Sequence, residues 1–262
     1  MKYIDIHAHV FPENIAAKAV DQLENYYHMK WQGNGTLPDL LQSMDKNQIS
    51  HTVIFSTATK PAQVPVIHDF ISGLCRQDSR LIGFGTMHPD FPEIEKEFER
   101  MCDLGLRGVK FHPDFQMIAI DDPRMIPIYR LIGSRVPVLI HMGDKNTDLS
   151  APVRLARVLD LVPELTVIAA HFGGYSAWDE ARKHLVGRNC YLDCSSSFPF
   201  LSYEDGEAII RSHGIDKILF ASDYPALLHD HAINDIRKMN FSEPEYEKIF
   251  YRNAAELLKI KI

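Results

Sequence analysis

The chain has 262 residues, a formal net charge of −7, 45% hydrophobic residues and 24% charged residues. This length supports a large hydrophobic core, and the acidic balance excludes a basic surface for nucleic acid or an anionic membrane. No apolar run is long enough to span a bilayer, and the N-terminus has no signal-peptide pattern, so we expect a cytoplasmic protein. The four cysteines have no CxxC spacing, so we expect reduced thiols in or near the core.

Apolar β-rich segments alternate with amphipathic segments along the chain. The expected strands are Lys2–His9, His51–Ser56, Leu81–Met87, Leu106–His112, Val136–His141, Thr166–His171, Asn189–Ser195 and Lys217–Asp223. Helices are expected after Pro12, from Pro38, over Ala62–Gln77, Glu93–Leu104 and Pro123–Ile132, after a capping Ser150, and over Ala177–Leu185, Tyr203–His213 and Leu227–Ile260. Within the last of these, Ser242 and Glu245 suggest a capping box.

This alternation predicts the fold class. Eight strands, each followed by a helix, within about 250 residues are typical of an α/β protein with a (β/α)8 TIM barrel. An open doubly wound sheet is the alternative, but the glycine-rich phosphate turn that often follows its first strand is absent here. There is no internal repeat or linker, so we expect a single domain over residues 1–262.

The first strand carries the most informative motif, Asp5-Ile6-His7-Ala8-His9. Side chains alternate along a strand, so Asp5, His7 and His9 are expected on one face and Ile4, Ile6, Ala8 and Val10 on the other. Two imidazoles on one face at a strand end can bind a zinc-like ion. We expect Asp5 to orient a ligand histidine through its other ring nitrogen. The alternative is a pair of structural core histidines.

Polar side chains recur at the ends of the other expected strands, where barrel enzymes build their sites. They are His88, Lys110, His112, His141, His171 and Asp223. Imidazoles with one carboxylate suit zinc, manganese or ferrous iron. Each residue also has a structural interpretation. His141 and His171 can face helices, Asp223 can cap a turn, Lys110 can point to solvent, and His88 and His112 can hydrogen-bond a loop. Trp31, Tyr175 and Trp178 either wall a pocket or cover the core.

The chain resembles the amidohydrolase superfamily, in its amidohydrolase-2 branch with aminocarboxymuconate semialdehyde decarboxylase and 2-pyrone-4,6-dicarboxylate lactonase. The motifs that carry the resemblance are Asp5-Ile6-His7-Ala8-His9, Gly108-Val109-Lys110-Phe111-His112-Pro113, His141-Met142-Gly143, Ala170-His171-Phe172-Gly173-Gly174, Leu219-Phe220-Ala221-Ser222-Asp223-Tyr224-Pro225 and Asn253-Ala254-Ala255. They occur in the family's order and span nearly the whole chain. The joint pattern is specific for superfamily and fold, and poorly specific for the reaction.

The resemblance implies one divalent metal, zinc first with manganese or ferrous iron as alternatives. Its expected ligands are His7, His9, His141 and Asp223, with His171 as an acid/base group or a guide for water. In two-metal branches a modified lysine on strand four bridges the ions, and histidines on strands five and six bind the second. Lys110, His141 and His171 occupy those places, so the number of ions stays open.

The leading functional hypothesis is metal-dependent hydrolysis of an ester, lactone or amide in a small, carboxylated molecule. A bound ion lowers the pKa of water from about 15.7 to around 7, and Asp223 accepts its proton. His171 and Lys110 stabilise the oxyanion, and Lys110 and His112 contact the substrate. A metal-dependent decarboxylase of a small aromatic or muconate-like acid is the nearest alternative, and a non-catalytic metal-binding protein is another. The oligomeric state is open, with a homodimer as one option.

Overall fold

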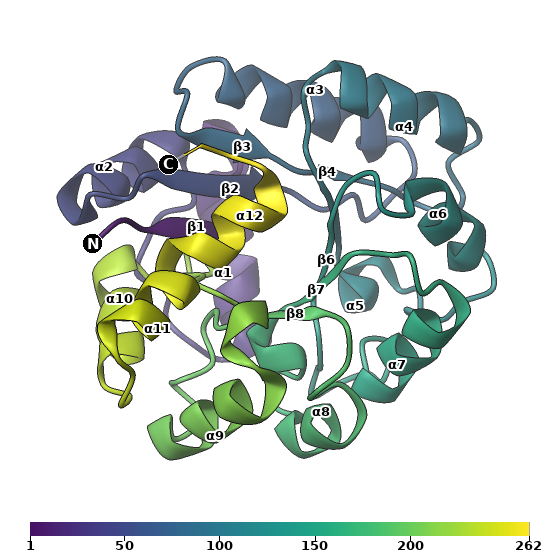
Figure 1. The fold of residues 1–262 in the computed structure, drawn as a ribbon. Helices are drawn as coiled ribbons and strands as arrows, with labels where there is room; N and C mark the ends of the chain where they lie inside the picture. The colour runs from purple at the N-terminus through teal and green to yellow at the C-terminus, as the bar shows by residue number, and fades with distance from the viewer. Residues whose placement is uncertain (262) are drawn as a thin grey trace.

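Parallel strands form a ring surrounded by helices in the computed structural model, which describes residues 1–261 (Figure 1). Only Phe84 separates β3 from β4, so the nine strand segments fill eight positions. Phe84 N–H bonds the Ile54 carbonyl, and Gly85 N–H bonds the Gly108 carbonyl, which links the two sheets across this point. The strands are β1 (Ile4–His9), β2 (His51–Phe55), β3 (Leu81–Gly83), β4 (Gly85–Thr86), β5 (Val109–Phe111), β6 (Val138–Ile140), β7 (Val167–Ala169), β8 (Tyr191–Asp193) and β9 (Ile218–Leu219).

Backbone hydrogen bonds join the first strand to the segment around β9. Ile6 N–H bonds the Phe220 carbonyl at 3.1 Å, and Asp223 N–H bonds the His7 carbonyl at 2.9 Å. Because the ladder from β4 to β9 is continuous and parallel, these bonds bring the last strand back to the first. The predicted single-domain TIM barrel is confirmed.

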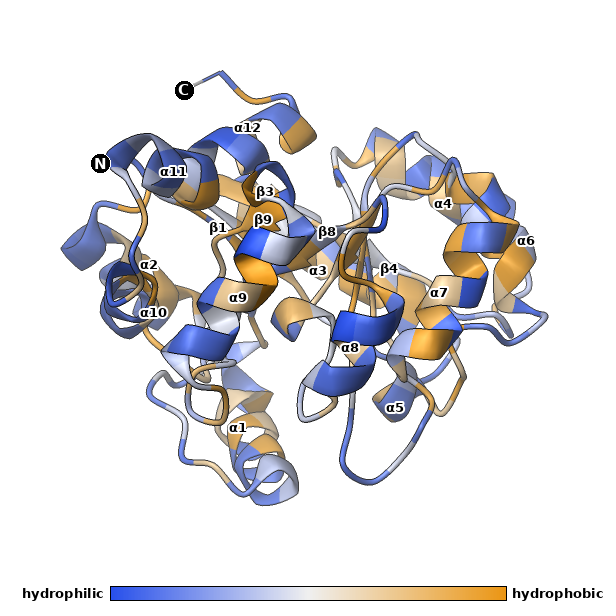
Figure 2. Cartoon of the chain, turned by 60° about the horizontal axis from the view of Figure 1, so that its bottom comes forward, coloured by the Kyte–Doolittle hydropathy of each residue, from blue (hydrophilic) through white to orange (hydrophobic). Residues whose placement is uncertain are grey.

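Helices cover the outside of the ring with their apolar sides turned inward (Figure 2). On α4, for example, Phe98 and Met101 are fully buried, whereas Glu95 and Lys96 are exposed. The helices are α1 (Glu13–Tyr27), α2 (Leu37–Asn47), α3 (Gln63–Cys75), α4 (Ile94–Asp103), α5 (Pro113–Gln116), α6 (Met125–Ile132), α7 (Pro152–Leu161), α8 (Trp178–His184), α9 (Tyr203–His213), α10 (His229–Arg237), α11 (Glu243–Glu247) and α12 (Asn253–Leu258).

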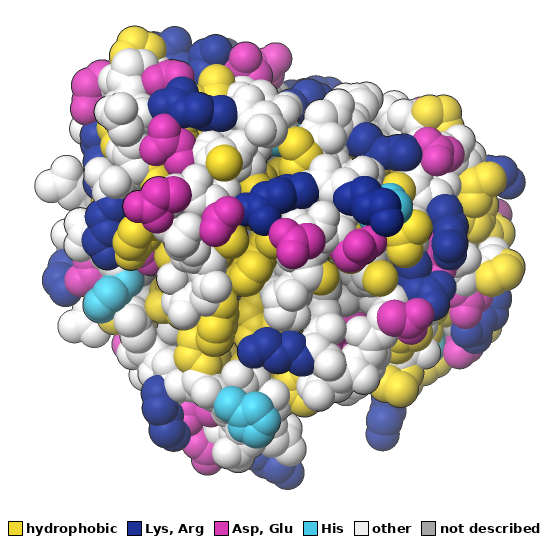
Figure 3. Space-filling view, turned by 90° about the horizontal axis from the view of Figure 1, so that it is seen from below, with side chains coloured by type: hydrophobic (Ala, Val, Ile, Leu, Met, Phe, Trp, Pro, Cys, Tyr) yellow, Lys and Arg dark blue, Asp and Glu magenta, His cyan; other side chains and the backbone are white. Residues whose placement is uncertain are grey.

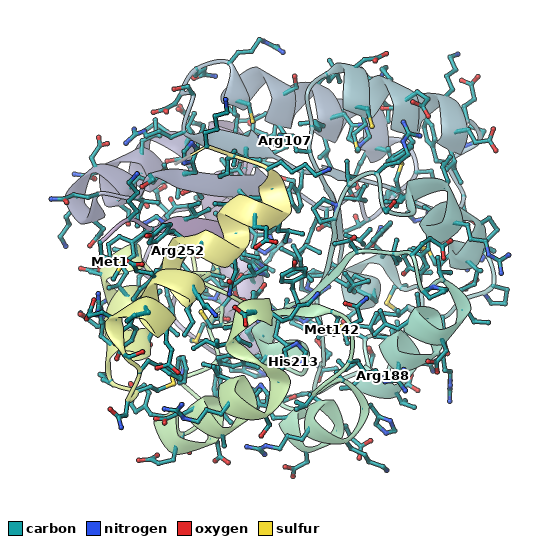
Figure 4. All side chains as sticks on the ribbon, viewed as in Figure 1. Met1, Arg107, Met142, Arg188, His213 and Arg252 are labelled. Carbon is teal, nitrogen blue, oxygen red and sulfur yellow. The ribbon has the colours of Figure 1, made fainter. Side chains whose placement is uncertain are left out.

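The two ends of the barrel are covered by different helices. At one end Ala254, Ala255 and Leu258 of α12 pack on the interior residues of the strands. Arg107, labelled in Figure 4, donates a hydrogen bond to the Leu258 carbonyl at this end. Helix α1 lies at the opposite end, as Figure 2 shows. The amino-terminal ends of the strands are therefore closed by α12, and the carboxyl ends face α1.

The strict alternation expected for the first strand is wrong. Its pairing with β2 shifts register between Asp5 and Ala8. Ile4 and Ile6 lie in the barrel interior, whereas Ala8 packs with the outer core beneath the helices. A bulge turns the residues that follow it toward the other face. The side chains of Asp5 and His7 therefore lie on different faces of the strand.

Two helix predictions also need correction. Ser150 does not cap α7; Ala151 occupies the N-cap position, because Pro152 fixes the first helical residue. The expected helix over Leu227–Ile260 is divided into α10, α11, a π-turn and α12. The capping box of Ser242 and Glu245 is confirmed, and it begins a new helix within that range.

The surface and thiols agree with the composition. Acidic and basic side chains are interspersed on the face shown in Figure 3. All four cysteines are free; Cys190 and Cys194 are buried and the other two are half-buried. Within residues 1–261, no helix combines the length and the apolar character needed to cross a bilayer.

Candidate active site

The carboxyl ends of the strands surround a pocket of about 470 Å³. Five of the polar residues expected from the sequence line it: His9, His112, His141, His171 and Asp223. His7 and Lys110 are fully buried beside them. His88 does not line the pocket; its Nδ1 accepts the Asp90 N–H at 3.2 Å, which is the loop role that the sequence left open.

Four side chains converge at the floor of this pocket. Oδ1 of Asp223 lies 3.2 Å from Nε2 of His7 and 3.4 Å from Nε2 of His9. The two histidine Nε2 atoms are 3.3 Å apart, and Lys110 Nζ lies 3.3 Å from Nε2 of His7. His171 lies beside His7, and His141 lies beside His171, with ring centroids 5.3 and 4.8 Å apart. We refer to the five residues that offer metal-ligand atoms, His7, His9, His141, His171 and Asp223, as the donor cluster; Lys110 is not part of it.

Asp193 fixes the tautomer of His7. Oδ2 of Asp193 lies 2.9 Å from Nδ1 of His7, and both side chains are fully buried. Burial alone raises the pKa of a carboxyl, but the contacts with His7 and His171 outweigh it and lower the pKa of Asp193 to about 2. The ionised carboxylate only accepts, so Nδ1 of His7 carries the proton and Nε2 presents a lone pair to Asp223 and His9.

Backbone carbonyls fix the tautomers of two further histidines. His141 Nε2 donates to the Gly143 carbonyl at 3.0 Å, and His171 Nδ1 donates to the Ser195 carbonyl at 3.0 Å. Their remaining nitrogens, Nδ1 of His141 and Nε2 of His171, face each other at 3.0 Å. Burial lowers the pKa of both rings, so both are neutral and two lone pairs meet.

This arrangement fits a divalent cation. Lone pairs of like partial charge repel unless a proton or a metal ion lies between them, and imidazole nitrogens with a carboxylate suit zinc, manganese or iron. Potential ligand atoms of His7, His171 and Asp223 all lie within 4.8 Å of one another. Lys110 Nζ, close to Nε2 of His7, provides a positive charge beside the cluster.

The role expected for Asp5 is wrong. Asp5 accepts hydrogen bonds from the backbone N–H groups of His7 and Ser222, each at 3.0 Å, and it contacts His229 Nε2 at 3.1 Å. It therefore ties β1 to the segment that carries Asp223, and Asp193 orients the histidine ring instead. The sequence feature that could have identified Asp193 is a charged residue inside the apolar strand segment Tyr191-Leu192-Asp193-Cys194.

The backbone turns sharply where the strands end. His171 and Asp223 adopt φ values of 57° and 63°, in the left-handed region that non-glycine residues rarely occupy. Ser196 donates to Oδ2 of Asp223 at 2.6 Å, which leaves Oδ1 directed at His7 and His9. Burial opposes ionisation of Asp223, but the neighbouring histidines hold its pKa well below the usual range.

Lys110 points into the barrel rather than to solvent. Its Nζ lies over the Phe55 ring, 4.8 Å from the centroid. Burial lowers the pKa of Lys110 to about 7, while Asp193 and Asp223 partly oppose the shift. The ammonium therefore exchanges its proton within the physiological pH range.

The upper wall of the pocket is aromatic. Tyr26 and Tyr27 come from the end of α1, and Trp31 comes from the loop that follows, so Trp31 walls the pocket, which is one of the two roles expected for it. Phe11, Phe115 and Tyr175 also belong to this wall, and Leu23, Met29 and Thr57 are among the other lining residues. Among the described residues that line the pocket, none is lysine or arginine. Trp178 does not line it; its indole N–H donates to the His171 carbonyl at 2.9 Å.

The fold and the cluster define a TIM-barrel protein with a metal-ligating type of site at the carboxyl ends of its strands. The sequence profile of the amidohydrolase family matches residues 4–260. The chain therefore belongs to the amidohydrolase family, and the assignment to this superfamily of enzymes is confirmed.

Solved structures with this fold cover nearly the whole chain. An uncharacterised TIM-barrel protein from Bordetella bronchiseptica is similar, with 19% identity, a TM-score of 0.79 and 99% of each chain covered. A dihydroxybenzoic acid decarboxylase from Polaromonas, with bound manganese and the inhibitor 2-nitroresorcinol, shares 18% identity, with a TM-score of 0.74 over 98% of this chain and 97% of that one. A probable 2-pyrone-4,6-dicarboxylic acid hydrolase from Acinetobacter baumannii, with citric acid bound, shares 19% identity, with a TM-score of 0.72 over 99% and 100%. At these identities the likeness concerns the fold.

Proposed function

We propose that the protein is a metal-dependent, non-oxidative decarboxylase of a small aromatic acid. The observation that carries this proposal is the contrast between the floor and the walls of the pocket. The floor holds the donor cluster and Lys110, whereas the described lining of the walls combines aromatic side chains with uncharged ones such as Leu23 and Gln22, and has no lysine or arginine. Such a pocket suits a flat ring with one anionic group, and that group lies at the floor.

The proposed ligands of the ion are His7, His9, His141 and Asp223, with zinc or manganese as the resident metal. A divalent ion bound there would hold the oxygen atoms of the substrate in place and would stabilise the negative charge that develops on the ring when the carbon–carbon bond breaks. Asp193, Gly143 and Ser195 keep the imidazole lone pairs directed at that position. The manganese reported in the Polaromonas decarboxylase supports a divalent ion in this type of site.

The reaction replaces a carbon–carbon bond with a carbon–hydrogen bond. The bond between the ring and its carboxylate breaks, the ring carbon takes up a proton, and carbon dioxide leaves. Asp223 is ionised, so the proton comes from water; Asp223 can relay it through Oδ1, because Ser196 occupies Oδ2. Nε2 of His171 presents a lone pair to the cluster and can return a proton to it. The Lys110 ammonium adds positive charge at the floor, where it can hold the carboxylate of the substrate in place before the bond breaks.

Hydrolysis of an uncharged aromatic ester, lactone or amide is the second candidate. It is favoured by the low pKa of Asp223, which keeps this carboxylate ionised and able to take a proton from water. The similarity to a probable pyrone-dicarboxylic acid hydrolase fits the same chemistry. No lysine or arginine lines the described pocket, and a cation available to a second carboxylate is Lys145, whose Nζ lies 5.9 Å from the ring centroid of Tyr175.

A direct assay separates the two reactions. Protein loaded with manganese or zinc is incubated with dihydroxybenzoic acids, and released carbon dioxide is measured beside hydrolysis of a panel of aryl esters and lactones. We expect carbon dioxide release that is lost in Asp223→Asn and unchanged in Asp160→Asn, whose side chain is exposed on the surface. Ester or lactone hydrolysis without carbon dioxide release from any acid would contradict the decarboxylase proposal.

A further inference from the structure

A tyrosine of the pocket wall is bonded to a buried histidine outside the donor cluster. Tyr27 is the last residue of α1, and its Oη lies 3.0 Å from Nε2 of His112. The Tyr27 ring packs edge-on against Tyr175, with centroids 5.6 Å apart, and lies 6.2 Å from the ring of His141. Contacts on several sides thus hold the hydroxyl near the donor cluster.

The surroundings of His112 determine which partner donates. The ring is stacked between His141 and Phe115, with centroid distances of 3.9 and 4.0 Å, so its plane is fixed. Nδ1 accepts the backbone N–H of Phe115 at 3.4 Å, and an accepting nitrogen carries no proton. An imidazole keeps at least one ring proton. The single ring proton therefore lies on Nε2, and His112 donates to Tyr27.

The phenol consequently keeps its own proton for another partner. Oη of Tyr27 accepts from His112, and it has no other hydrogen-bond partner within residues 1–261. Burial raises the pKa of Tyr27 well above its ordinary value, so the phenol stays protonated at neutral pH. A neutral phenol that already accepts one hydrogen bond is a stronger donor through its O–H, because hydrogen bonds in a chain polarise one another.

We infer that Tyr27 donates a hydrogen bond to an oxygen of the bound aromatic ligand, and that His112 is a positioning residue that orients the Tyr27 hydroxyl. The identity of the ligand as an aromatic acid rests on the proposed function; the direction of the His112–Tyr27 bond does not. Tyr27 then selects ligands with an oxygen acceptor on the ring side that faces α1. His112 reaches the substrate through Tyr27, since both of its nitrogens are already bonded.

The first test reads the tautomer without any turnover. Nitrogen-15 NMR of histidine-labelled, zinc-loaded protein reports which ring nitrogen of His112 is protonated, and His112→Gln identifies its signals. We expect a protonated Nε2 and an unprotonated Nδ1. A protonated Nδ1, or a cationic ring at neutral pH, would overturn the inference whether or not the protein releases carbon dioxide.

The second test measures the dissociation constant of 2-nitroresorcinol for the zinc-loaded protein by calorimetry. Tyr27→Phe should weaken binding about tenfold, the usual size of one hydrogen bond to a polar ligand atom. His112→Gln places an amide N–H near the position of Nε2 and should stay within about twofold, whereas His112→Asn, which is too short, should weaken binding about threefold.

Tyr203→Phe is the matched control, because it removes a hydroxyl that bonds Asp235 outside the pocket. It should bind the probe as the unmodified protein does. Equal affinity of Tyr27→Phe and the unmodified protein would overturn the inference, and so would equal loss in His112→Gln and His112→Asn. If the probe binds as expected but no acid is decarboxylated, the proposed reaction fails and the role of Tyr27 stands.

Discussion

Replacing Asp193 with asparagine should reverse the tautomer of His7. Oδ1 of Asp193 accepts three hydrogen bonds, from the backbone N–H groups of His171 and Ser195 and from the Ser195 hydroxyl. Backbone N–H groups only donate, so the asparagine carbonyl must take the Oδ1 position and its NH2 group must face Nδ1 of His7. Nδ1 then becomes an acceptor, the ring proton moves to Nε2, and the lone pair directed at the donor cluster is lost.

The magnitude follows from the role of such outer partners. Loss of a residue that orients a ligand histidine typically weakens metal binding by about 10- to 100-fold, or about 1.4–2.7 kcal/mol. We expect Asp193→Asn to fall in this range when zinc affinity is measured by competition with a chelator. Asp160→Asn is the control, because it changes an exposed carboxylate that pairs with Arg188.

Zinc affinity and the thermal stability of the metal-free variant together distinguish a change of the His7 tautomer from a general loss of stability. The metal-free variant should unfold near the temperature of the unmodified metal-free protein, because the carbonyl preserves the three bonds of Oδ1. Unchanged zinc affinity in Asp193→Asn would refute the assignment of the His7 tautomer. Weak zinc binding together with a poorly folded metal-free variant would show that Asp193 is needed for folding rather than for ligand orientation.

Two further predictions concern stability. Gly143→Ala should lower the free energy of unfolding by about 2 kcal/mol or more in a denaturant titration. The reason is that Gly143 has a φ of +75° and an added Cβ would lie 2.2 Å from the Tyr175 carbonyl oxygen. A decrease of less than about 0.5 kcal/mol, which is typical of neutral surface changes, would contradict this packing. The metal-free protein should become less stable as the pH falls below about 6.5, because burial lowers the pKa of eight histidines and the unfolded chain then binds more protons. Equal unfolding midpoints at about pH 7.5 and 5.5 would contradict the neutral state of these histidines in the folded protein. The eight are His9, His51, His68, His88, His112, His141, His171 and His213.

The sequence predicts the barrel because its signal is local and repeated. Each apolar strand segment ends in a polar residue, and a parallel ring brings those ends together, so His9, His141, His171 and Asp223 are expected at one pocket and do lie there. The face of Lys110 is also predictable, because it alternates with the apolar Val109 and Phe111.

The orienting residues are less accessible to sequence reasoning. Asp5 is two residues from His7 and is expected on the same face, but the register shift in β1 places the two side chains on different faces. Asp193 is 186 positions from His7 and reaches it only because β8 stands beside β9 in the ring. Tyr27 belongs to a helix whose position over the strand ends depends on tertiary packing, and no local pattern marks it.

The most direct test of the account is the divalent-metal content of the purified protein and of the double variant His7→Ala/Asp223→Ala. The account predicts stoichiometric metal in the unmodified protein and in His231→Ala, whose ring is exposed on α10, and none in the double variant, although that variant stays folded. Full metal content in the folded double variant would show that the ion binds elsewhere and would contradict the site.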